Sequence, residues 1–127
     1  MCSAQRQSVA PPPTQAAPAA ACELGSAYFD LDSSTLSDSA RDQLSRNAQC
    51  LRSRQGRGVH LTGTCDPRGT EEYNLALGER RAQSAQQYLK SLGVTGDVTV
   101  SSMGEELATG TEESGWARDR RVDFKFK

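Results

Sequence analysis

The sequence predicts an α+β domain whose elements follow the order β-α-β-α-β-α-β, with a mixed four-stranded sheet and helices packed on one face. Two observations predict this fold. Short segments in which apolar and polar residues alternate, typical of strands, are separated by longer segments in which apolar residues recur at helical spacing. Each predicted helix also carries a single apolar stripe, so it can bury only one side against a sheet.

The first strand and the first helix begin the domain. Residues 27–31 form a strand-like run, which the polar residues 32–34 end. A helix is expected from about Ser37 to Arg54, with Ser37 or Ser39 as its cap. Its apolar residues share one face and are Ala40, Leu44, Ala48 and Leu51.

The second strand and the second helix form the middle of the domain. Residues 58–64 alternate and predict a strand. The helix follows Gly69-Thr70 and runs to Leu92, after which Gly93 supplies a left-handed stop. Its inward stripe consists of Gly78, Ala82, Ala85, Leu89 and Leu92. Because three of these residues are small, we expect this helix to lie close against the sheet.

The last three elements are shorter. Residues 98–102 predict a third strand. Thr111, followed by two glutamates, is typical of a capped helix start, and this short helix is expected to run to about Asp119. Residues 121–127 predict the last strand, because apolar and charged residues alternate along it.

The first 22 residues are expected to lie outside the folded domain. They are rich in Pro, Ala, Gln and Ser, and Val9 is their only large aliphatic residue. Such a segment cannot bury enough apolar surface to offset the entropy of ordering it. We therefore expect a disordered tether over residues 1–22, able to reach roughly 70 Å when extended, and one folded domain over residues 23–127.

Composition excludes several classes of function. The chain of 127 residues carries 15 basic and 16 acidic residues, and its net charge of −1 provides no basic surface for nucleic acid. Its apolar runs are shorter than the roughly 20 residues that a membrane-spanning helix needs. One domain of ordinary size with a tail fits this length.

The four cysteines do not have the spacing of a metal site. Cys2, Cys22, Cys50 and Cys65 contain no C-x-x-C pair, and His60 is the only histidine. No metal and no cofactor are therefore expected. The pairing stays open, because if Cys2 is modified, either one of the other three thiols stays free or all three are buried and reduced.

An acid and an arginine mark the most informative stretch, residues 66–81. Asp66 ends the second strand, Gly69 makes a turn, and the helix carries Arg81 back towards the acid. An ionised Asp accepts hydrogen bonds from an ammonium, and the planar guanidinium of Arg can bind a carboxylate through two N–H groups. This pair suits a ligand that is zwitterionic at one end.

Four segments carry a resemblance to a known family. They lie, in order, at residues 28–32, 66–82, 103–106 and 120–122. Together they resemble the outer-membrane protein A-like (OmpA-like) domain family, and within it the peptidoglycan-associated lipoproteins of Gram-negative bacteria most of all. The resemblance covers residues 26–127 and implies a non-catalytic domain that grips the meso-diaminopimelate residue of the peptidoglycan stem peptide.

The resemblance assigns roles residue by residue. Asp66 matches the acid that takes the diaminopimelate amine, and Arg81 matches the arginine that takes its carboxylate. The other residues that it places at the ligand are Phe29, Asp30, Gly69, Thr70, Asn74 and Leu77. It implies no cofactor.

The resemblance also implies a place in the cell envelope. Cys2 matches the lipidated first residue of the mature family members, so it is the expected anchor in the outer membrane, with the domain facing the periplasm. A domain so placed links the outer membrane to the cell wall. TolB and other Tol–Pal proteins are the expected protein partners.

Two positions depart from the family pattern. Thr64 stands where the family usually has His, which affects any contact that the histidine makes in the loop. Asp119 stands where the family usually has Asn, and this added acid is free to pair with Arg120 instead of supporting the pocket.

Three other functions remain as alternatives. Asp30, Asp32 and Asp66 are the carboxylates that a glycosidase-like enzyme would need. An interaction domain that no longer binds the wall is the second alternative. The periplasmic part of a flagellar stator, which shares the domain, is the third.

Overall fold

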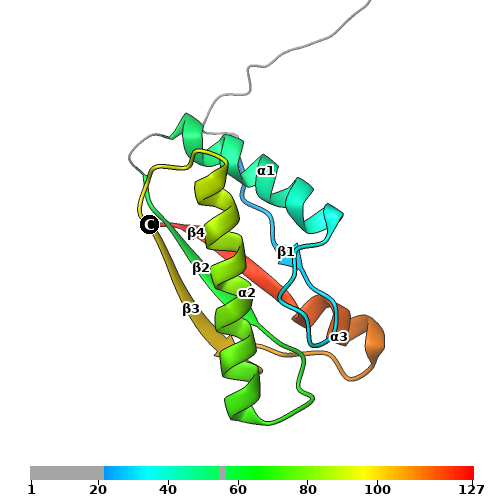
Figure 1. Ribbon diagram of the computed structural model, residues 1–127. Coiled ribbons are helices and arrows are strands. Elements are labelled where there is room, and N and C mark those ends of the chain that lie inside the picture. Colours follow the sequence, from blue (N-terminus) through cyan, green and yellow to red (C-terminus); the bar gives the residue numbers. More distant parts are fainter. Residues whose placement is uncertain (1–21, 55–56) are drawn as a thin grey trace, which may run out of the picture.

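The computed structural model describes residues 22–54 and 57–127, and it confirms the predicted element order and fold class (Figure 1). The strands are β1 (Ala27–Tyr28), β2 (Val59–Thr64), β3 (Val98–Gly104) and β4 (Arg121–Phe126), and the helices are α1 (Asp38–Ser53), α2 (Glu71–Ser91) and α3 (Glu113–Asp119). Nearly all of the predicted tether, including Cys2, lies outside the described residues.

The strands β1 and β3 differ most in length from the prediction, whereas β2 and β4 are each one residue shorter. β1 contains only Ala27–Tyr28, since the chain turns away soon afterwards at Asp32, whose φ of 55° is left-handed. β3 continues to Gly104, because Thr64 at the end of β2 pairs with Gly104 after a register shift. The short β1 leaves residues 29–37 as a loop over the end of the sheet.

The sheet is mixed, as predicted. Its strand order is β1-β4-β2-β3, in which β2 and β3 are parallel and β4 is antiparallel to both of its neighbours. A parallel pair needs a crossover, and α2 provides it between β2 and β3. The carboxyl end of β2 and the first turn of α2 are therefore joined by one short loop, residues 65–70.

The core lies between the sheet and the two long helices. α1 and α2 pack on one face of the sheet, and α3 lies at the end of the sheet, beside the start of β4 (Figure 1). Ser37 caps α1 by accepting from the backbone N–H of Ala40, and Thr70 caps α2 by accepting from that of Tyr73. The fully buried apolar side chains of α1, α2 and the sheet include Leu44, Ala48, Leu61, Ala82, Ala85, Leu89 and Val122.

The helix α2 lies close against β2 and β3, as the small residues of the stripe predict. A Cβ on Gly63 would lie 1.8 Å from the carbonyl oxygen of Gly78, and a Cβ on Gly78 would lie 2.2 Å from Oγ of Ser102. No side chain fits at either glycine without moving a backbone. The two glycines therefore fix the depth of α2 on the sheet, and with it the position of every side chain that α2 directs towards the end of β2.

One disulfide answers the question of cysteine pairing. Cys22 and Cys50 are joined, with 5.6 Å between their Cα atoms, and the bond ties the segment before β1 to α1. Cys65 is free and buried at the end of β2. Of the two alternatives that the sequence left open, the one with a single free thiol is correct.

The substitution Gly63→Ala tests the close approach of α2. We expect it to lower the free energy of unfolding by about 1–3 kcal/mol, because the new methyl group meets helix backbone that has to shift. Urea denaturation followed by circular dichroism measures the change. Gln83→Ala on the exposed face of α2 is the control and should stay within about 0.5 kcal/mol of the parent. Equal stability of Gly63→Ala and the parent would contradict the contact.

Reduction of the disulfide tests its contribution to stability. It closes a loop of sequence separation 28, so the chain-entropy model predicts a loss of about 3.5 kcal/mol on reduction. Thermal unfolding with and without a reductant measures this loss. A double variant with Ser at positions 22 and 50 should start at the lower stability and show no response to the reductant. A response of that variant would assign the effect to the remaining cysteines, Cys2 and Cys65, and not to this bond.

Candidate functional site

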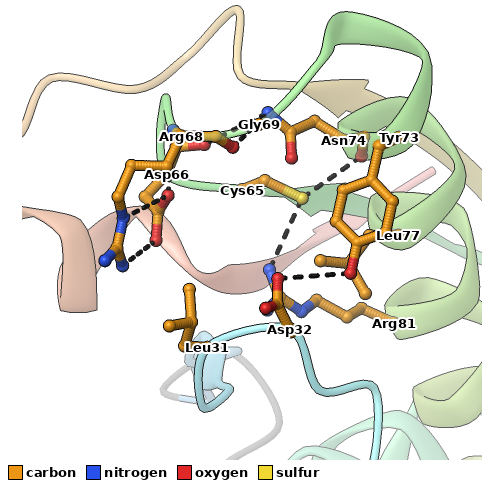
Figure 2. Close-up of a pocket in the computed structure, with 10 residues that line it drawn as sticks. All are labelled: Leu31, Asp32, Cys65, Asp66, Arg68, Gly69, Tyr73, Asn74, Leu77 and Arg81. Atoms are coloured by element: carbon orange, nitrogen blue, oxygen red, sulfur yellow. Dashed lines mark hydrogen bonds and ion pairs between the residues drawn. The ribbon is translucent and has the colours of Figure 1, made fainter.

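A pocket of about 260 Å³ lies at the carboxyl end of β2, between the loop after β1 and the first turns of α2 (Figure 2). Its walls come from three segments that are distant in sequence. The residues that line it are Leu31, Asp32, Cys65, Asp66, Arg68, Gly69, Tyr73, Asn74, Leu77 and Arg81. Figure 2 shows the Asp66–Arg68 pair on one side and Arg81 with Asp32 on the other.

Asp66 is buried and is fully engaged by two arginines. Its Oδ1 accepts from the backbone N–H and from Nε of Arg68, both at 3.1 Å. Its Oδ2 accepts from Nη2 of Arg68 at 2.8 Å and from Nη1 of Arg120 at 3.4 Å. Burial raises the pKa of Asp66, but the hydrogen bonds and charge of Arg68, with a further hydrogen bond from Arg120, outweigh burial and lower the pKa overall. Asp66 is therefore a carboxylate at neutral pH.

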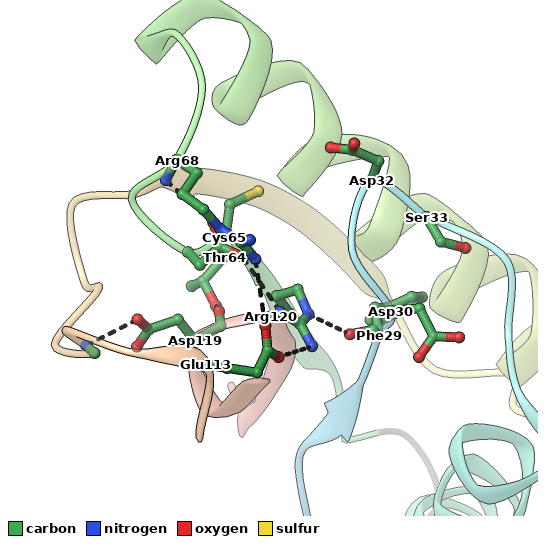
Figure 3. A network of polar contacts seen from close by, with 12 residues as sticks. Phe29, Asp30, Asp32, Ser33, Thr64, Cys65, Arg68, Glu113, Asp119 and Arg120 are labelled. Atoms are coloured by element: carbon green, nitrogen blue, oxygen red, sulfur yellow. Dashed lines mark hydrogen bonds and ion pairs between the residues drawn. The ribbon is translucent and has the colours of Figure 1, made fainter. Parts of the chain in front are cut away.

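Arg120 and Arg68 hold Asp66 in different ways. Arg120 is buried, and it also donates from Nε to the carbonyl of Phe29 at 2.9 Å and from Nη2 to Glu113 at 3.2 Å (Figure 3). Arg68 is partly exposed, and its guanidinium carbon lies 4.2 Å from the ring centre of Trp116. Arg120 thus joins the end of β1 to α3, whereas Arg68 covers Asp66 from the solvent side.

Arg81 is 1% exposed and is held mainly by backbone carbonyls. Nε donates to Ser33 O at 2.8 Å, Nη2 donates to Asp30 O at 2.9 Å, and Nη1 donates to Thr64 O at 3.0 Å. Nη1 also donates to Sγ of Cys65 at 3.5 Å. A guanidinium has five N–H groups, so a single one, on Nη2, remains without a partner in the described residues. Burial lowers the pKa of Arg81.

The remaining wall is held by hydrogen bonds from the first turn of α2. The side-chain Nδ2 of Asn74 donates to Glu105 Oε1 at 2.7 Å and to the carbonyl of Arg68 at 2.9 Å, which fixes the loop before the helix. The hydroxyl of Tyr73 donates to Oδ1 of Asp32 at 3.2 Å and closes one side. Burial and this hydrogen bond raise the pKa of the Tyr73 hydroxyl.

The thiol of Cys65 lies in the same pocket and stays protonated. Sγ donates to the carbonyl of Asn74 at 3.2 Å. Burial raises the pKa of the thiol, although the nearby charge of Arg81 acts in the opposite direction. A buried, protonated thiol is a poor nucleophile, so Cys65 acts here as a packing residue.

Five of the eight residues that the sequence placed at the ligand line the pocket: Asp66, Gly69, Asn74, Leu77 and Arg81. The other three lie next to it. Phe29 and Asp30 offer their backbone carbonyls to Arg120 and Arg81, and Thr70 caps α2. The pocket residues that the prediction missed are Leu31, Asp32, Cys65, Arg68 and Tyr73. Arg68 carried a usable signal, since a side chain two residues beyond Asp66 in a tight turn can reach back to it.

The two departures from the family pattern have clear outcomes. Thr64 donates from its hydroxyl to the carbonyl of Asp119 at 2.6 Å, so it joins β2 to the end of α3. The expected pairing of Asp119 with Arg120 is wrong. The carboxylate of Asp119 instead accepts from the backbone N–H groups of Thr109 and Gly110, at 3.0 and 2.9 Å. Arg120 is left to support Asp66.

Two kinds of feature are absent from residues 22–54 and 57–127. No group of three or more His, Cys, Asp and Glu side chains there is placed to hold a metal ion. In the same part of the chain, no helix has the length and apolar character to cross a membrane.

Comparison with known proteins places the chain in a family. The sequence model of the OmpA family matches residues 28–121. The peptidoglycan-associated lipoprotein of Pseudomonas putida is 46% identical over 101 residues, which cover 77% of this chain and 60% of that protein. The protein of the same name from Rhizobium meliloti is 41% identical over 98 residues, which cover 75% of this chain and 56% of that protein. The chain thus spans no more than about 60% of the length of these relatives.

Solved structures agree with this placement. The crystal structure of the peptidoglycan-associated lipoprotein from Burkholderia pseudomallei superposes with a TM-score of 0.74 at 40% identity, over 80% of this chain and 89% of that one. The C-terminal domain of Helicobacter pylori MotB gives a TM-score of 0.75 at 16% identity, over 83% of this chain and 85% of that one, which shows a shared fold alone. Because the family model matches most of the domain and a relative of high identity has the same fold, the chain belongs to the OmpA family.

Proposed function

We propose that this domain binds peptidoglycan without cleaving it, by holding the zwitterionic side-chain end of meso-diaminopimelate in the pocket. One observation carries the proposal: an ionised acid, Asp66, and a buried cation, Arg81, line one small pocket from different elements. The printed names of the most similar relatives, which call them peptidoglycan-associated, support the ligand class.

The ligand end matches the charges of the pocket. The ammonium pairs with Asp66, which only accepts hydrogen bonds, and the carboxylate takes the remaining N–H of Arg81 together with its charge. Because backbone carbonyls hold the other N–H groups, Arg81 offers a single hydrogen bond and not the two of a bidentate fork. We therefore expect Arg81 to raise the affinity for a ligand with a carboxylate by about tenfold over a ligand without one. A bidentate contact would give a larger factor.

The acids of the site support binding and not catalysis. A glycosidase needs one carboxyl group with a raised pKa as its acid, whereas the pKa of Asp66 is lowered. His60 bonds to Oγ of Ser101 at 2.8 Å, but its other ring nitrogen bonds to the hydroxyl of Thr99 at 2.6 Å and not to a carboxylate. It therefore lacks the acid that orients the base of a catalytic triad. The relatives are named peptidoglycan-associated lipoproteins, which supports a role in binding.

We extend the proposal to the location of the domain. The relatives are named lipoproteins, which supports an envelope location, a lipid anchor at Cys2 and a tether over residues 1–22. The domain would then face the periplasm and link the outer membrane to the wall. TolB and other Tol–Pal proteins are the proposed protein partners. The stator alternative draws only on structures of low identity, which share the fold alone.

Ligand choice tests the role of Arg81 without changing the protein. Soluble stem peptides with meso-diaminopimelate should bind at least about tenfold more tightly than peptides with lysine, which keeps the amine but lacks the carboxylate. Amidation of that carboxylate should weaken binding similarly. Isothermal titration calorimetry measures the three affinities. Equal affinities would contradict the assignment of the carboxylate to Arg81.

The substitution Asp66→Asn tests the acid. We expect it to weaken both the diaminopimelate and the lysine peptides by about tenfold or more, since each loses the partner of its ammonium. Asp97→Asn is a matched control, because Asp97 is also paired and its pKa is also lowered, by Lys127, but it lies away from the pocket. Loss of binding in both variants would point to surface charge and not to the pocket.

The same acid predicts a pH dependence of stability. The folded-state pKa of Asp66 lies below its ordinary value of 3.8, so its contribution to stability is fully present above that value. The contribution is lost as pH falls through the lower, folded-state pKa. In urea denaturation between pH 2 and 6, the free energy of unfolding should therefore fall more steeply with decreasing pH for the parent than for Asp66→Asn. Parallel curves would show that Asp66 does not titrate differently in the folded domain.

A further inference from the structure

The carboxylate proposed to bind the ligand ammonium is already covered by the protein. The side chain of Asp66 is 5% exposed, and both of its oxygens accept from Arg68. An ammonium that enters from the pocket cannot make a full ion pair with Asp66 while this cover is in place. One neighbouring side chain therefore has to move before the ligand binds.

Arg68 is the neighbour that is able to move. Arg120, the other partner of Asp66, has a side chain 10% exposed and is also bonded to Phe29 and Glu113. The side chain of Arg68 is 35% exposed. Among the described residues its guanidinium donates to Asp66 alone, and its Nη1 has no hydrogen-bond partner. Swinging Arg68 away breaks its contacts to Asp66 and its contact with the ring of Trp116, whereas moving Arg120 would also release the end of β1.

The number of sheltered ion pairs before and after binding decides which ligands can displace Arg68 without losing one. Before binding, Asp66 pairs with Arg68 and with Arg120, and the pair with Arg120 stays in place. A ligand that has only an ammonium pairs with Asp66 and leaves the guanidinium of Arg68 with Glu113 as its remaining acidic neighbour. Oε1 of Glu113 lies 3.8 Å from Nη2 of Arg68, and the Glu113 side chain is 66% exposed, so solvent screens this ion pair. A zwitterionic ligand brings a carboxylate as well, so one sheltered ion pair is replaced by two.

We propose that Arg68 is a specificity-determining residue: it holds Asp66 until a zwitterionic ligand end displaces it, and it then pairs with the carboxylate of that ligand. The proposal rests on the proposed function, because it names a second cation for the same ligand. Arg81, held by three carbonyls, positions the surrounding backbone and supplies a fixed charge, whereas Arg68 exchanges partners. An amine without a carboxylate competes with Arg68 and is disfavoured.

Two variants of Arg68 and one control test the exchange. Arg68→Gln removes the competing charge, and Arg68→Met also keeps an apolar stem beside Trp116. Arg80→Gln is the control, since Arg80 is an exposed arginine on α2 that makes no contact with Asp66 in the described residues. Calorimetry with the diaminopimelate and lysine peptides, after a check of folding by thermal unfolding, gives the affinities of all four proteins.

Removal of Arg68 should change the two ligands differently. The lysine peptide is expected to bind about tenfold more tightly to both Arg68 variants, because it no longer competes with an ion pair of the protein. The diaminopimelate peptide should change by less than about threefold, because the loss of a carboxylate partner offsets the easier access to Asp66. The preference for diaminopimelate thus falls about tenfold, while Arg80→Gln leaves it unchanged.

The remaining outcomes separate the two proposals. Weaker binding of both peptides to the Arg68 variants, or an unchanged preference, would overturn the role of Arg68 while leaving the proposed function intact. Failure of the parent protein to bind either peptide would overturn the proposed function itself. Trp116 is the only tryptophan, so its fluorescence reports the displacement of Arg68. The emission should change when diaminopimelate peptide saturates the parent, and an unchanged emission would show that Arg68 stays in place.

Discussion

A buried guanidinium holds together the segments that form the pocket. Arg81 reaches from α2 to the carbonyls of Asp30 and Ser33 in the loop after β1, and to that of Thr64 at the end of β2. A charge this deeply buried is costly unless polar groups surround it, and here oriented carbonyl dipoles compensate it in place of a direct carboxylate partner. Within residues 22–54 and 57–127, no acid forms an ion pair with this cation.

Asp66, on the other side of the pocket, is compensated mainly by charged side chains instead of backbone dipoles. Asp66 is surrounded by Arg68 and Arg120, and Glu113 balances the second arginine. This cluster is close to neutral and is strongly bonded, so the acid stays ionised although it is buried. A fixed cation on one side and an exchangeable ion pair on the other give a site that is polarised and still adds little net charge to the protein. Both halves depend on the Gly63–Gly78 contact, because it sets how deeply α2 lies on the sheet.

The sequence was sufficient for the fold and for half of the site. Periodicity located the strands and the two long helices, a capping pattern located α3, and the small residues Gly78, Ala82 and Ala85 predicted the close packing of α2. Prediction from the sequence failed where several groups compete in three dimensions for the same hydrogen-bond partner. Asp119 had Arg120 as its neighbour in sequence, but two backbone N–H groups of the preceding loop were better placed. The bidentate role expected of Arg81 assumed free N–H groups, and spacing along a chain cannot show that backbone carbonyls already hold them.

The disulfide has a mechanical consequence for a domain that is pulled through its N-terminal segment. The strand β1 is only two residues long, and a force applied there would separate it from β4 by breaking their hydrogen bonds one after another. The bond between Cys22 and Cys50 diverts that load into α1, which is packed against α2 and the rest of the core. The stretch between the two cysteines, which contains β1 and the loop held by Arg81, is thereby shielded from tension. A steady pull on the chain would then leave the geometry of the pocket unchanged until the core itself begins to yield.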